Sequence, residues 1–445
     1  MNRILILFLV VLNITSLFAQ SNEVDAQIQF KSFQEVLEYA DKHAINIQSA
    51  VIGEQLAKAG KKEAKSYLYP SINASAGYNN NLTIQPTLIP AEIFNPTAPA
   101  GTFEELTFGK QHLSSAGIQV QWDILNFQKI FASETAGIVA EQSAVNTQKS
   151  KLYTYNVLAS TYYSILLAQE SIRIYEKNVR VSETIYDNTL EKFQKGILSE
   201  AELNAAEIKQ LENRRRLHLA ITNGSRFYTQ LQSQLNTSGQ ITVSDTPQNF
   251  ILADTTLHNS HPEINWQEME VDKYESLLKQ KKALLLPNLS FTYQNNYNWA
   301  SDSFMNFSDA NELPQEFIGA KLNIPVFNGF SSRQKIKQSK LQLQQQELQL
   351  ESTKLVTQKE DELLLLDISQ YSTELSDNLQ IMELMQKNDV HAKNQYQSGI
   401  TSLDNRLDTY EDLLKAQDNY LQSLAAFTLA EYKIYIRQID FTTNN

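Results

Sequence analysis

Few residues in this sequence have the types and spacing that a catalytic or metal site requires. His258 and His261 are close enough to suggest a shared metal ion, but they lie beside Pro262 in a polar linker, where surface histidines are commoner. The sequence has no phosphate-binding glycine loop, no Gly-x-Ser-x-Gly and no His-Glu-x-x-His. Its abundant carboxylates fall on helix faces, where solvation is their usual role. We therefore expect no enzymatic activity, no cofactor and no metal site.

A short motif that occurs twice is more informative than these side chains. The two copies are Phe193-Gln194-Lys195-Gly196-Ile197-Leu198-Ser199 and Tyr396-Gln397-Ser398-Gly399-Ile400-Thr401-Ser402. Glycine readily adopts the left-handed conformation that ends a helix, and serine suits the cap of the helix that follows. We therefore expect Gly196 and Ser199, and again Gly399 and Ser402, to form the tight tip of a helical hairpin. A capped turn without any partner would explain the same residue types.

Two further pairs of segments match in the same order. Tyr69-Pro70 corresponds to Leu286-Pro287, and the alternating run 117–126 corresponds to 319–328, each ending at Asn. Three matching landmarks in one order indicate a structural unit that is used twice. We predict a signal peptide over 1–19, a first repeat over 20–240, a linker or peripheral element over 241–262, a second repeat over 263–436 and a tail over 437–445.

Composition limits the class of protein and its compartment. The chain has 445 residues, a formal net charge of −12 and no cysteine. Such an acidic surface should repel nucleic acid. The lack of cysteine excludes disulfides and thiolate metal sites, and it leaves no cysteine to carry a lipid, so we do not expect a lipoprotein.

The first nineteen residues resemble a secretory signal peptide. Arg3 provides the positive start, residues 4–12 form the apolar segment, and Ala19 is a small residue before a cleavage at Gln20. A buried N-terminal strand or helix is the alternative, but the sequence turns abruptly polar after residue 19. We therefore expect an exported protein.

Most of the chain has helical character. Segments rich in Glu, Lys, Gln, Leu and Ala, without internal proline, are expected to be helices over 32–67, 128–194, 200–235, 263–283, 333–397 and 401–436. A helix of about 65 residues would be about 100 Å long, which is rare outside coiled coils. Leu403, Leu407, Tyr410 and Leu414 follow the coiled-coil spacing of four, three and four. Helix-on-helix packing is therefore expected along both hairpins.

Four short segments alternate between apolar and polar residues instead. They cover 72–79, 116–124, 289–299 and 318–324, and each is expected to be a strand with one apolar and one polar face. Lengths of about 10 residues suit the strands of a transmembrane barrel. The residues expected to face lipid are Ala74, Ala76, Ile118, Val120, Leu289, Phe291, Ala320 and Leu322. A soluble sandwich with its apolar face inward is the alternative.

Four strands cannot close a barrel, and an open sheet edge in lipid would leave backbone groups unpaired. Two chains would supply eight strands, whose interior side chains fill, whereas three chains would supply twelve and leave a pore. A trimer is therefore the smallest assembly that both closes and conducts. The proline-containing segment 83–111 and the segment 300–315 are expected to be irregular hairpin loops on the outer cell surface.

Taken together, the chain resembles the TolC-like outer membrane efflux proteins. The resemblance rests on Tyr69-Pro70 and Leu286-Pro287 before strands, on Ile324-Pro325-Val326-Phe327-Asn328-Gly329 after one, and on the two tip motifs. It implies a mainly α fold with a transmembrane β-barrel, in which a homotrimer forms a twelve-stranded barrel and a long periplasmic α-helical tunnel. It implies a passive outer membrane export channel of a tripartite efflux or type I secretion system.

The resemblance also implies partners. Gly196, Ser199, Gly399 and Ser402 match the family's tip motif and would dock to a periplasmic adaptor that couples to an inner membrane pump. A soluble periplasmic coiled-coil scaffold is the alternative function, and it would leave the four strands without a role. The cargo is not identified by the sequence, because a tunnel need not recognise what passes through it.

Family members often place acidic residues just after the second tip, where they narrow the closed periplasmic mouth. Asp408 falls at one such position, but the other position holds Asn405, with Asp404 beside it. A full double ring of carboxylates is therefore not expected. In a trimer, Asp408 alone would form a ring of three carboxylates that attracts cations. The alternative is that Asp404 and Asp408 are solvated charges on a helix face.

Overall fold

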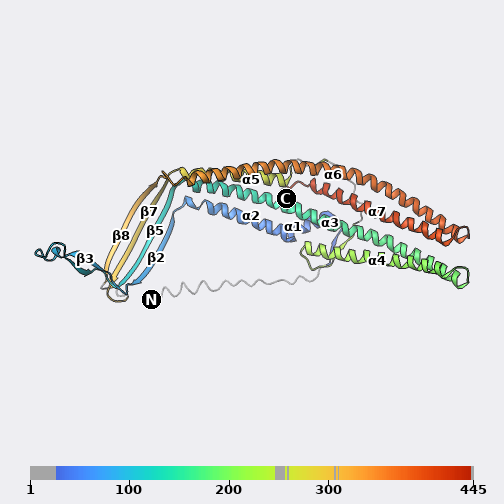
Figure 1. Cartoon of the computed structure of the whole chain (residues 1–445), viewed down its shortest axis with the longest axis horizontal. Coiled ribbons are helices and arrows are strands. Elements are labelled where there is room, and N and C mark those ends of the chain that lie inside the picture. The colour runs from blue at the N-terminus through green and yellow to red at the C-terminus, as the bar shows by residue number, and fades with distance from the viewer. Residues whose placement is uncertain (1–26, 246–255, 258–259, 305–306, 309, 442–445) are drawn as a thin grey trace. The chain divides into compact units, whose positions relative to one another are not determined.

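The computed structural model describes residues 27–245, 256–257, 260–304, 307–308 and 310–441 (Figure 1). The predicted signal peptide and His258 lie outside these described residues. The chain divides into two compact units. The first unit comprises Met1–Ser49, Ser150–Asn259 and Glu360–Asn445, and the second comprises Ala50–Lys149 and Ser260–Lys359. Each unit therefore draws on both halves of the sequence.

The second unit contains a four-stranded sheet. Its strands are β2 (Ser71–Asn80), β5 (His112–Asn126), β7 (Asn288–Ser301) and β8 (Asn311–Asn323). They lie in the order β2-β5-β7-β8, and every neighbouring pair is antiparallel. All four strands expected from the alternating pattern are present, and each is longer than the alternation alone indicated.

Every strand of this sheet joins a helix directly, through one short turn or, between β8 and α6, through the segment 324–330. The helices are α2 (Ile45–Ala64), which precedes β2, α3 (Phe127–Gln194), which follows β5, α5 (Pro262–Lys282), which precedes β7, and α6 (Ser331–Gln397), which follows β8. The 3-10 turns η1 (Ser66–Leu68) and η4 (Ala283–Leu285) join α2 to β2 and α5 to β7. Tyr69-Pro70 and Leu286-Pro287 follow these two turns, so the matching sequence landmarks occupy matching places in the structure.

Polar contacts within the second unit place its helices in the same order as the strands. Lys61 on α2 lies 3.6 Å from Glu141 on α3. Gln142 on α3 donates to Glu270 on α5 over 2.7 Å. Gln267 on α5 donates to the side chain of Gln346 on α6 over 3.2 Å. The helices thus form a layer in the order α2-α3-α5-α6 (Figure 1).

The loop between β2 and β5 is more regular than the sequence analysis predicted. Strands β3 (Pro86–Pro90) and β4 (Phe103–Thr107) pair as an antiparallel hairpin, with the short turn η2 (Ala91–Ile93) between them. Prolines occupy both ends of β3, where a missing N–H group disturbs a two-stranded ribbon least. The expectation of an irregular loop over 83–111 was therefore wrong for this ribbon.

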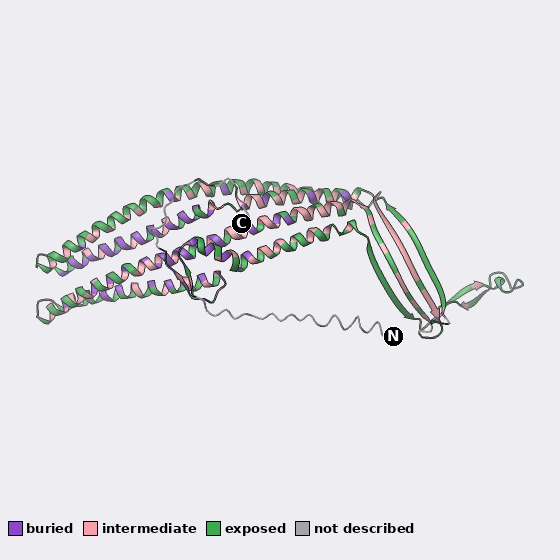
Figure 2. Cartoon of the chain, turned by 180° about the vertical axis from the view of Figure 1, so that it is seen from behind, coloured by how far each residue is buried: buried purple, intermediate pink, exposed green. Residues whose placement is uncertain are grey.

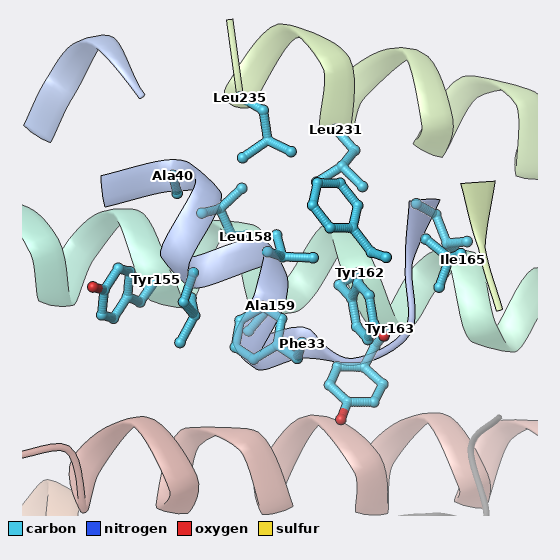
Figure 3. Close-up of a cluster of buried hydrophobic side chains, with 14 of the residues drawn as sticks. Phe33, Ala40, Tyr155, Leu158, Ala159, Tyr162, Tyr163, Ile165, Leu231 and Leu235 are labelled. Atoms are coloured by element: carbon cyan, nitrogen blue, oxygen red, sulfur yellow. The ribbon is translucent and has the colours of Figure 1, made fainter. Parts of the chain in front are cut away.

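The first unit is built around a hydrophobic core of several short and long elements. Strands β1 (Ile28–Phe30) and β6 (Ile241–Val243) pair in parallel, and α1 (Phe33–His43) packs beside them. Figure 3 shows Phe33 from α1 among Leu158, Tyr162 and Tyr163 of α3, with Leu231 of α4 (Glu200–Gln234) nearby. α7 (Leu403–Arg437) contributes Tyr432 and Ile436 to the same core.

The predicted helix over 32–67 is broken at Ala44. This residue has an extended conformation with ψ of 121°, and it separates α1 from α2. The Gln48 side chain donates to the Asp41 carbonyl over 2.9 Å, which satisfies one carbonyl that the break releases. Ala44 itself is buried. Because the break depends on tertiary packing rather than on glycine or proline, the local sequence did not indicate it.

Within the described residues, every helix is too short or too polar to be a membrane span.

Candidate functional site

The first tip motif ends α3 with a left-handed glycine. Gly196 has a φ of 71°. Its N–H group donates to the Phe193 carbonyl over 2.8 Å, and the N–H group of Ile197 donates to the Lys192 carbonyl over 2.9 Å. This pair of bonds is the Schellman arrangement, which satisfies the last carbonyls of a helix.

The second tip repeats this geometry at the end of α6. Gly399 also has a φ of 71°. Its N–H group donates to the Tyr396 carbonyl over 3.1 Å, and the N–H group of Ile400 donates to the Gln395 carbonyl over 2.9 Å. The hairpin tips expected from the repeated motif are therefore present, and their backbones match in detail.

A serine caps the helix that follows each tip. At α4, the Ser199 hydroxyl accepts from the Glu202 N–H group over 3.4 Å, and the Glu202 carboxylate accepts from the Ser199 N–H group over 2.8 Å. This capping box holds the pKa of Glu202 below its usual value, because the backbone hydrogen bond favours the charged carboxylate. At α7, the Ser402 hydroxyl accepts from the Asn405 N–H group over 3.3 Å, without a carboxylate in the reciprocal place.

Both tips expose an apolar side chain. Ile197 and Ile400 are 66% and 75% exposed, respectively. Each isoleucine follows its glycine directly, so the two tips present the same short apolar feature. Isolated exposed isoleucines are ordinary, and here the same exposed residue type occurs at both tips.

The predicted mouth residues lie in the first two turns of α7. Asp404, Asn405 and Asp408 are all exposed, whereas Arg406 and Leu407 between them are buried. Asn405 donates to the Thr401 hydroxyl over 3.3 Å, which fixes it at the tip. In the part of the chain that the structure describes, neither Asp404 nor Asp408 has a salt-bridge partner. Both carboxylates are thus free to face solvent or a neighbouring chain.

The sequence analysis missed a buried ion pair close to the second tip. Arg406 on α7 pairs with Asp389 on α6, and the two side chains are only 3% and 12% exposed. The guanidinium group also lies 5.5 Å from the centre of the Tyr410 ring. Arg406 directly precedes Leu407, so it lies next to the apolar stripe of α7. A charged residue beside the coiled-coil stripe was the signal that could have indicated a buried partner.

A second polar cluster links α3 and α4 to α7. The Tyr175 hydroxyl and the Arg216 guanidinium both donate to the Asp418 carboxylate, over 3.0 and 2.7 Å. Burial and the nearby Asp418 charge raise the pKa of Tyr175 to about 12. Lys209 on α4 likewise donates to Glu411 over 2.8 Å. These partners are far apart in sequence, so sequence spacing did not indicate them.

In the sheet, the residues predicted to face lipid share one face. Residues opposite each other in neighbouring strands point the same way, and the pairing aligns Ile72, Val120, Tyr293 and Ile318 in one row. The next rows align Ala74 with Ile118, Phe291 with Ala320, and Leu289 with Leu322. Tyr78 and Trp299 lie on this face toward the ends of β2 and β7 that adjoin the strand-connecting loops. Toward the ends that adjoin the helices, the face carries Trp122.

Two features of this apolar face differ from the simple alternation. A register shift between Asp123 and Leu125 leaves Ile124 without a partner, so Leu125 rather than Ile124 pairs with Leu289. Glu316 also lies on the apolar face, where it accepts a hydrogen bond from the Tyr293 hydroxyl over 2.8 Å. Apolar and polar residues therefore alternate along β8 only from Ile318 onward.

The opposite face of the sheet is polar and largely without charge. Three consecutive rows are Ser71, Gln121, Thr292 and Gly319; Asn73, Gln119, Gln294 and Phe317; and Ser75, Gly117, Asn296 and Gln315. None of these described residues is ionisable, although the chain as a whole has a net charge of −12. These three rows can hydrogen-bond water but have no charge with which to hold an ion. The next row toward the helices adds Asp123 and Lys321 to the same face.

Among the described residues of the second unit, the two faces of the sheet are largely uncovered. Figure 2 shows buried residues along the helices, whereas the residues of the four strands are exposed or intermediate except Ser301. Ile72 is exposed on the apolar face, as are Ile118 and Ile318. A face with this many exposed apolar side chains requires a non-aqueous environment or another protein.

The second unit also has two free edges. β2 and β8 each have one neighbour in the described sheet, so one side of each strand is unpaired. The helices at the same ends of the layer expose apolar residues with helical spacing: Ile52 and Leu56 on α2, and Leu341, Leu348 and Leu355 on α6. The spacing of seven on α6 is that of a coiled-coil seam.

Comparison with known proteins identifies the family. A sequence profile described as outer membrane efflux protein matches residues 36–237 and again 255–442. The chain belongs to this family. The outer membrane efflux family is one of channels rather than enzymes, so the chain is an outer membrane efflux channel protein. The two matched segments correspond to the two halves of the repeated element order.

Solved structures show the same fold. The channel CusC superimposes with a TM-score of 0.73 at 16% identity, covering 94% of this chain and 95% of that one. The outer membrane protein VceC of Vibrio cholerae gives 0.72 at 13% identity, covering 92% and 96%. The Campylobacter jejuni outer membrane channel CmeC gives 0.69 at 18% identity, covering 91% and 84%. No curated protein matches the sequence significantly.

These findings confirm the fold class expected from the sequence. The chain is mainly α, with long helical hairpins and barrel strands in two repeats, and its place in the cell is the outer membrane. His261 is one of the two histidines that the sequence analysis considered as metal ligands. Its side chain caps α5 by accepting a hydrogen bond from the Glu263 N–H group over 3.1 Å. Among the described residues, no cluster of three or more potential metal ligands occurs.

Proposed function

We propose that three copies of this chain form a closed channel for export across the outer membrane. The observation that carries the proposal is the pair of free edges on the second unit. An open layer whose two ends are complementary closes into a ring when β8 and α6 of one copy meet β2 and α2 of the next. Since neighbouring strands alternate in direction throughout the sheet, β8 and the next β2 would also pair antiparallel. Three copies would give twelve strands around a pore.

The apolar face of the sheet supports a lipid contact. From Leu289 to Trp299 the strand covers about 33 Å at about 3.3 Å per residue, and a tilt near 40° makes this about 25 Å of membrane depth. Ala74, Ala76, Ile118, Val120, Leu289, Phe291, Ala320 and Leu322 would form the lipid-facing surface. The polar face would then line the pore, and Tyr78 and Trp299 would lie at one membrane interface.

The hairpin tips would dock to a periplasmic adaptor that couples the channel to an inner membrane pump. Gly196 and Gly399 set the backbone at the tips, Ser199 and Ser402 hold the next helices, and the exposed isoleucines supply apolar contact. The assembly would be a tripartite efflux or type I secretion system. The repeats over 20–240 and 263–436, joined by 241–262 and followed by 437–445, would each supply one hairpin and two strands.

The exposed carboxylates after the second tip would narrow the periplasmic mouth. Asp408 would form a ring of three charges in the trimer, with Asp404 and Asn405 beside it. Asp408→Asn should therefore weaken the block of conductance by a multivalent cation, whereas Asp377→Asn, on α6 and away from the tip, should not. Unchanged block in the Asp408 variant would show that this carboxylate is a solvated surface charge.

Export through a signal peptide over 1–19, without lipid attachment, is part of the proposal. Membrane fractionation of the natively exported protein tests the whole assembly. Recovery in the outer membrane after an alkaline carbonate wash, with a detergent-extracted mass of three chains, is the expected result. Release as a soluble species would instead support a periplasmic coiled-coil scaffold. The mass of the mature chain would also show whether residues 1–19 are removed and whether a lipid is present.

A further inference from the structure

The first unit contains a cavity that borders the first tip and has Ile197 in its wall. It has a volume of about 580 Å³ and lies between the last turns of α3, the last turns of α6 and the start of α7. Sites for small organic ligands usually have volumes of about 300–1,000 Å³. The cavity belongs to a single chain, so its existence does not depend on how copies assemble.

One part of the cavity wall is apolar. Val181 and Ile185 on α3, Val390 on α6 and Leu413 on α7 all line it. Ile185 and Leu413 also belong to the hydrophobic core near the tips. Aliphatic side chains from three helices thus offer a surface against which a ring system could pack.

The remainder of the wall is rich in cations. Lys177, Lys192, Lys195, Lys393 and Arg406 line the cavity, against only two carboxylates, those of Glu191 and Asp389. Those two carboxylates are already paired, Glu191 with Lys195 and Asp389 with Arg406. This surplus of positive charge is unusual in a chain whose net charge is −12.

Three of the lysines have no acidic partner. Among the described residues, Lys177, Lys192 and Lys393 form no salt bridge, and Lys192 lies 3.9 Å above the Tyr396 ring. Lys177 and Lys393 are exposed, so their ammonium groups are accessible from solvent.

We infer that this cavity binds a small organic anion with an apolar body, such as an aromatic carboxylate or sulfonate. The apolar body would pack against Val181, Ile185 and Leu413. The anionic group would be attracted to Lys177 and Lys393. A bound anion would therefore contact α3, α6 and α7 together.

Naphthalene-1-sulfonate is a suitable probe, because it combines a two-ring apolar body with one permanent negative charge. Binding is measured by isothermal titration calorimetry on the full chain in lipid nanodiscs, with empty nanodiscs as the reference. We expect saturable binding that weakens at least tenfold in the double variant Lys177→Gln, Lys393→Gln. Lys387→Gln removes an exposed lysine from α6 outside the cavity and should leave the affinity unchanged.

A matched cation separates charge recognition from simple apolar partitioning. The 1-naphthyltrimethylammonium ion should bind at least tenfold more weakly than the sulfonate, and added salt should weaken the sulfonate only.

Three results would overturn the inference: absence of saturable binding to the wild-type protein, equal affinity of the double variant, or equal affinity for the cation. If the double variant is recovered in a changed oligomeric state, the single variants decide instead. Lys393→Gln and Lys177→Gln should each weaken binding severalfold. If the cavity is shaped for an adaptor segment and not for a small anion, the wild-type protein should bind no probe. That result counts against the inference.

Discussion

Matching glycines in the two repeats show how a single residue constrains the sheet. A β-carbon at Gly117 would lie 1.9 Å from the Asn296 side-chain oxygen and 2.8 Å from the Asn295 backbone oxygen. A β-carbon at Gly319, the corresponding position, would meet nothing within 4 Å. Because Gly117 belongs to an internal strand and Gly319 to an edge strand, only the first is required by close approach of a neighbour.

Gly117→Ala should lower the amount of folded protein in the outer membrane severalfold. The Asn296 side chain can rotate away, but the Asn295 carbonyl is part of the backbone and can move only if the strand pairing shifts. Immunoblotting of washed outer membranes measures the effect. Gly319→Ala is the matched control and should reach close to the wild-type amount. Equal loss in both variants would show that glycine is needed at these positions for another reason.

The capping box of α4 gives the first tip a dependence on pH. The pKa of Glu202 is lowered in the folded protein, so its stabilising effect is fully present above the ordinary carboxyl pKa and is lost as the pH falls through the lowered value. Amide exchange in the first turn of α4 should become about twofold to fivefold faster, relative to intrinsic rates, below about pH 4. Hydrogen exchange with mass spectrometry measures this change.

Glu202→Gln is the control for that effect. The glutamine side chain can still accept a hydrogen bond from the Ser199 N–H group, but it does not titrate. Exchange in the first turn of α4 should therefore be independent of pH in this variant after correction for intrinsic rates. A pH dependence that persists unchanged would assign the effect to a different carboxyl group.

At the scale of elements, the sequence predicted the helices and strands whose positions depend on a local pattern of residues. The long helices α3, α4, α6 and α7 begin and end within two residues of the expected positions. They lack proline, α3 and α6 end just before a glycine turn, and α4 and α7 begin at a serine cap. The strands were recognised because apolar and polar residues alternate along them. The break at Ala44, the β3–β4 ribbon and the bulge at Ile124 were missed, because pairing and packing with distant segments decide them.

The candidate site likewise contains some features that the sequence predicts and others that it does not. The tips could be predicted, because a glycine in the left-handed region and a serine cap act within a few residues. The Asp389–Arg406 pair and the Tyr175–Arg216–Asp418 cluster could not be predicted, because each joins helices that are far apart in sequence. The cavity beside the second tip depends on three helices together and left no single local pattern.

Substitutions on the two faces of β5 test which face of the strand meets lipid. Val120→Arg places a charge on the apolar face, where such a change costs about 2–4 kcal/mol at the membrane midplane. The variant should therefore be strongly depleted from carbonate-washed outer membranes, and Ala74→Arg on β2 should behave similarly. Gln119→Arg, on the polar face of the same strand, should be recovered near the wild-type amount. Equal depletion of all three variants would contradict the assigned faces.

At the scale of the whole molecule, the exposed stripe on α6 should act as an interface between copies. Leu348 is 67% exposed in the single chain, with Leu341 and Leu355 one heptad away on either side. Burying a leucine contributes about 1.5–3 kcal/mol, and a three-fold ring repeats each contact three times. Leu348→Glu should therefore shift the detergent-extracted protein from trimer toward monomer, as measured by native mass spectrometry.

Gln349→Glu is the matched control for this interface. Gln349 is the next residue on α6 and is also exposed, so the variant introduces the same charge beside the apolar stripe. It should remain trimeric. A trimer that survives Leu348→Glu would show that the copies meet through other surfaces, and dissociation of both variants would indicate a general effect of added charge.

The three uncharged rows of the polar face predict how the assembled channel responds to a new charge. Gln119 lies in a row with Asn73 and Gln294, without an ionisable residue nearby in that row. In a trimer, Gln119→Arg would place three positive charges around a neutral section of the pore, where low dielectric walls strengthen their field. The reversal potential in a potassium chloride gradient should therefore move toward the chloride potential, as measured in planar bilayers.

Gln119→Asn preserves neutrality and should give the wild-type reversal potential. If Gln119→Arg inserts and conducts with an unchanged reversal potential, Gln119 does not face the conducting path, and the polar face lies elsewhere in the assembly.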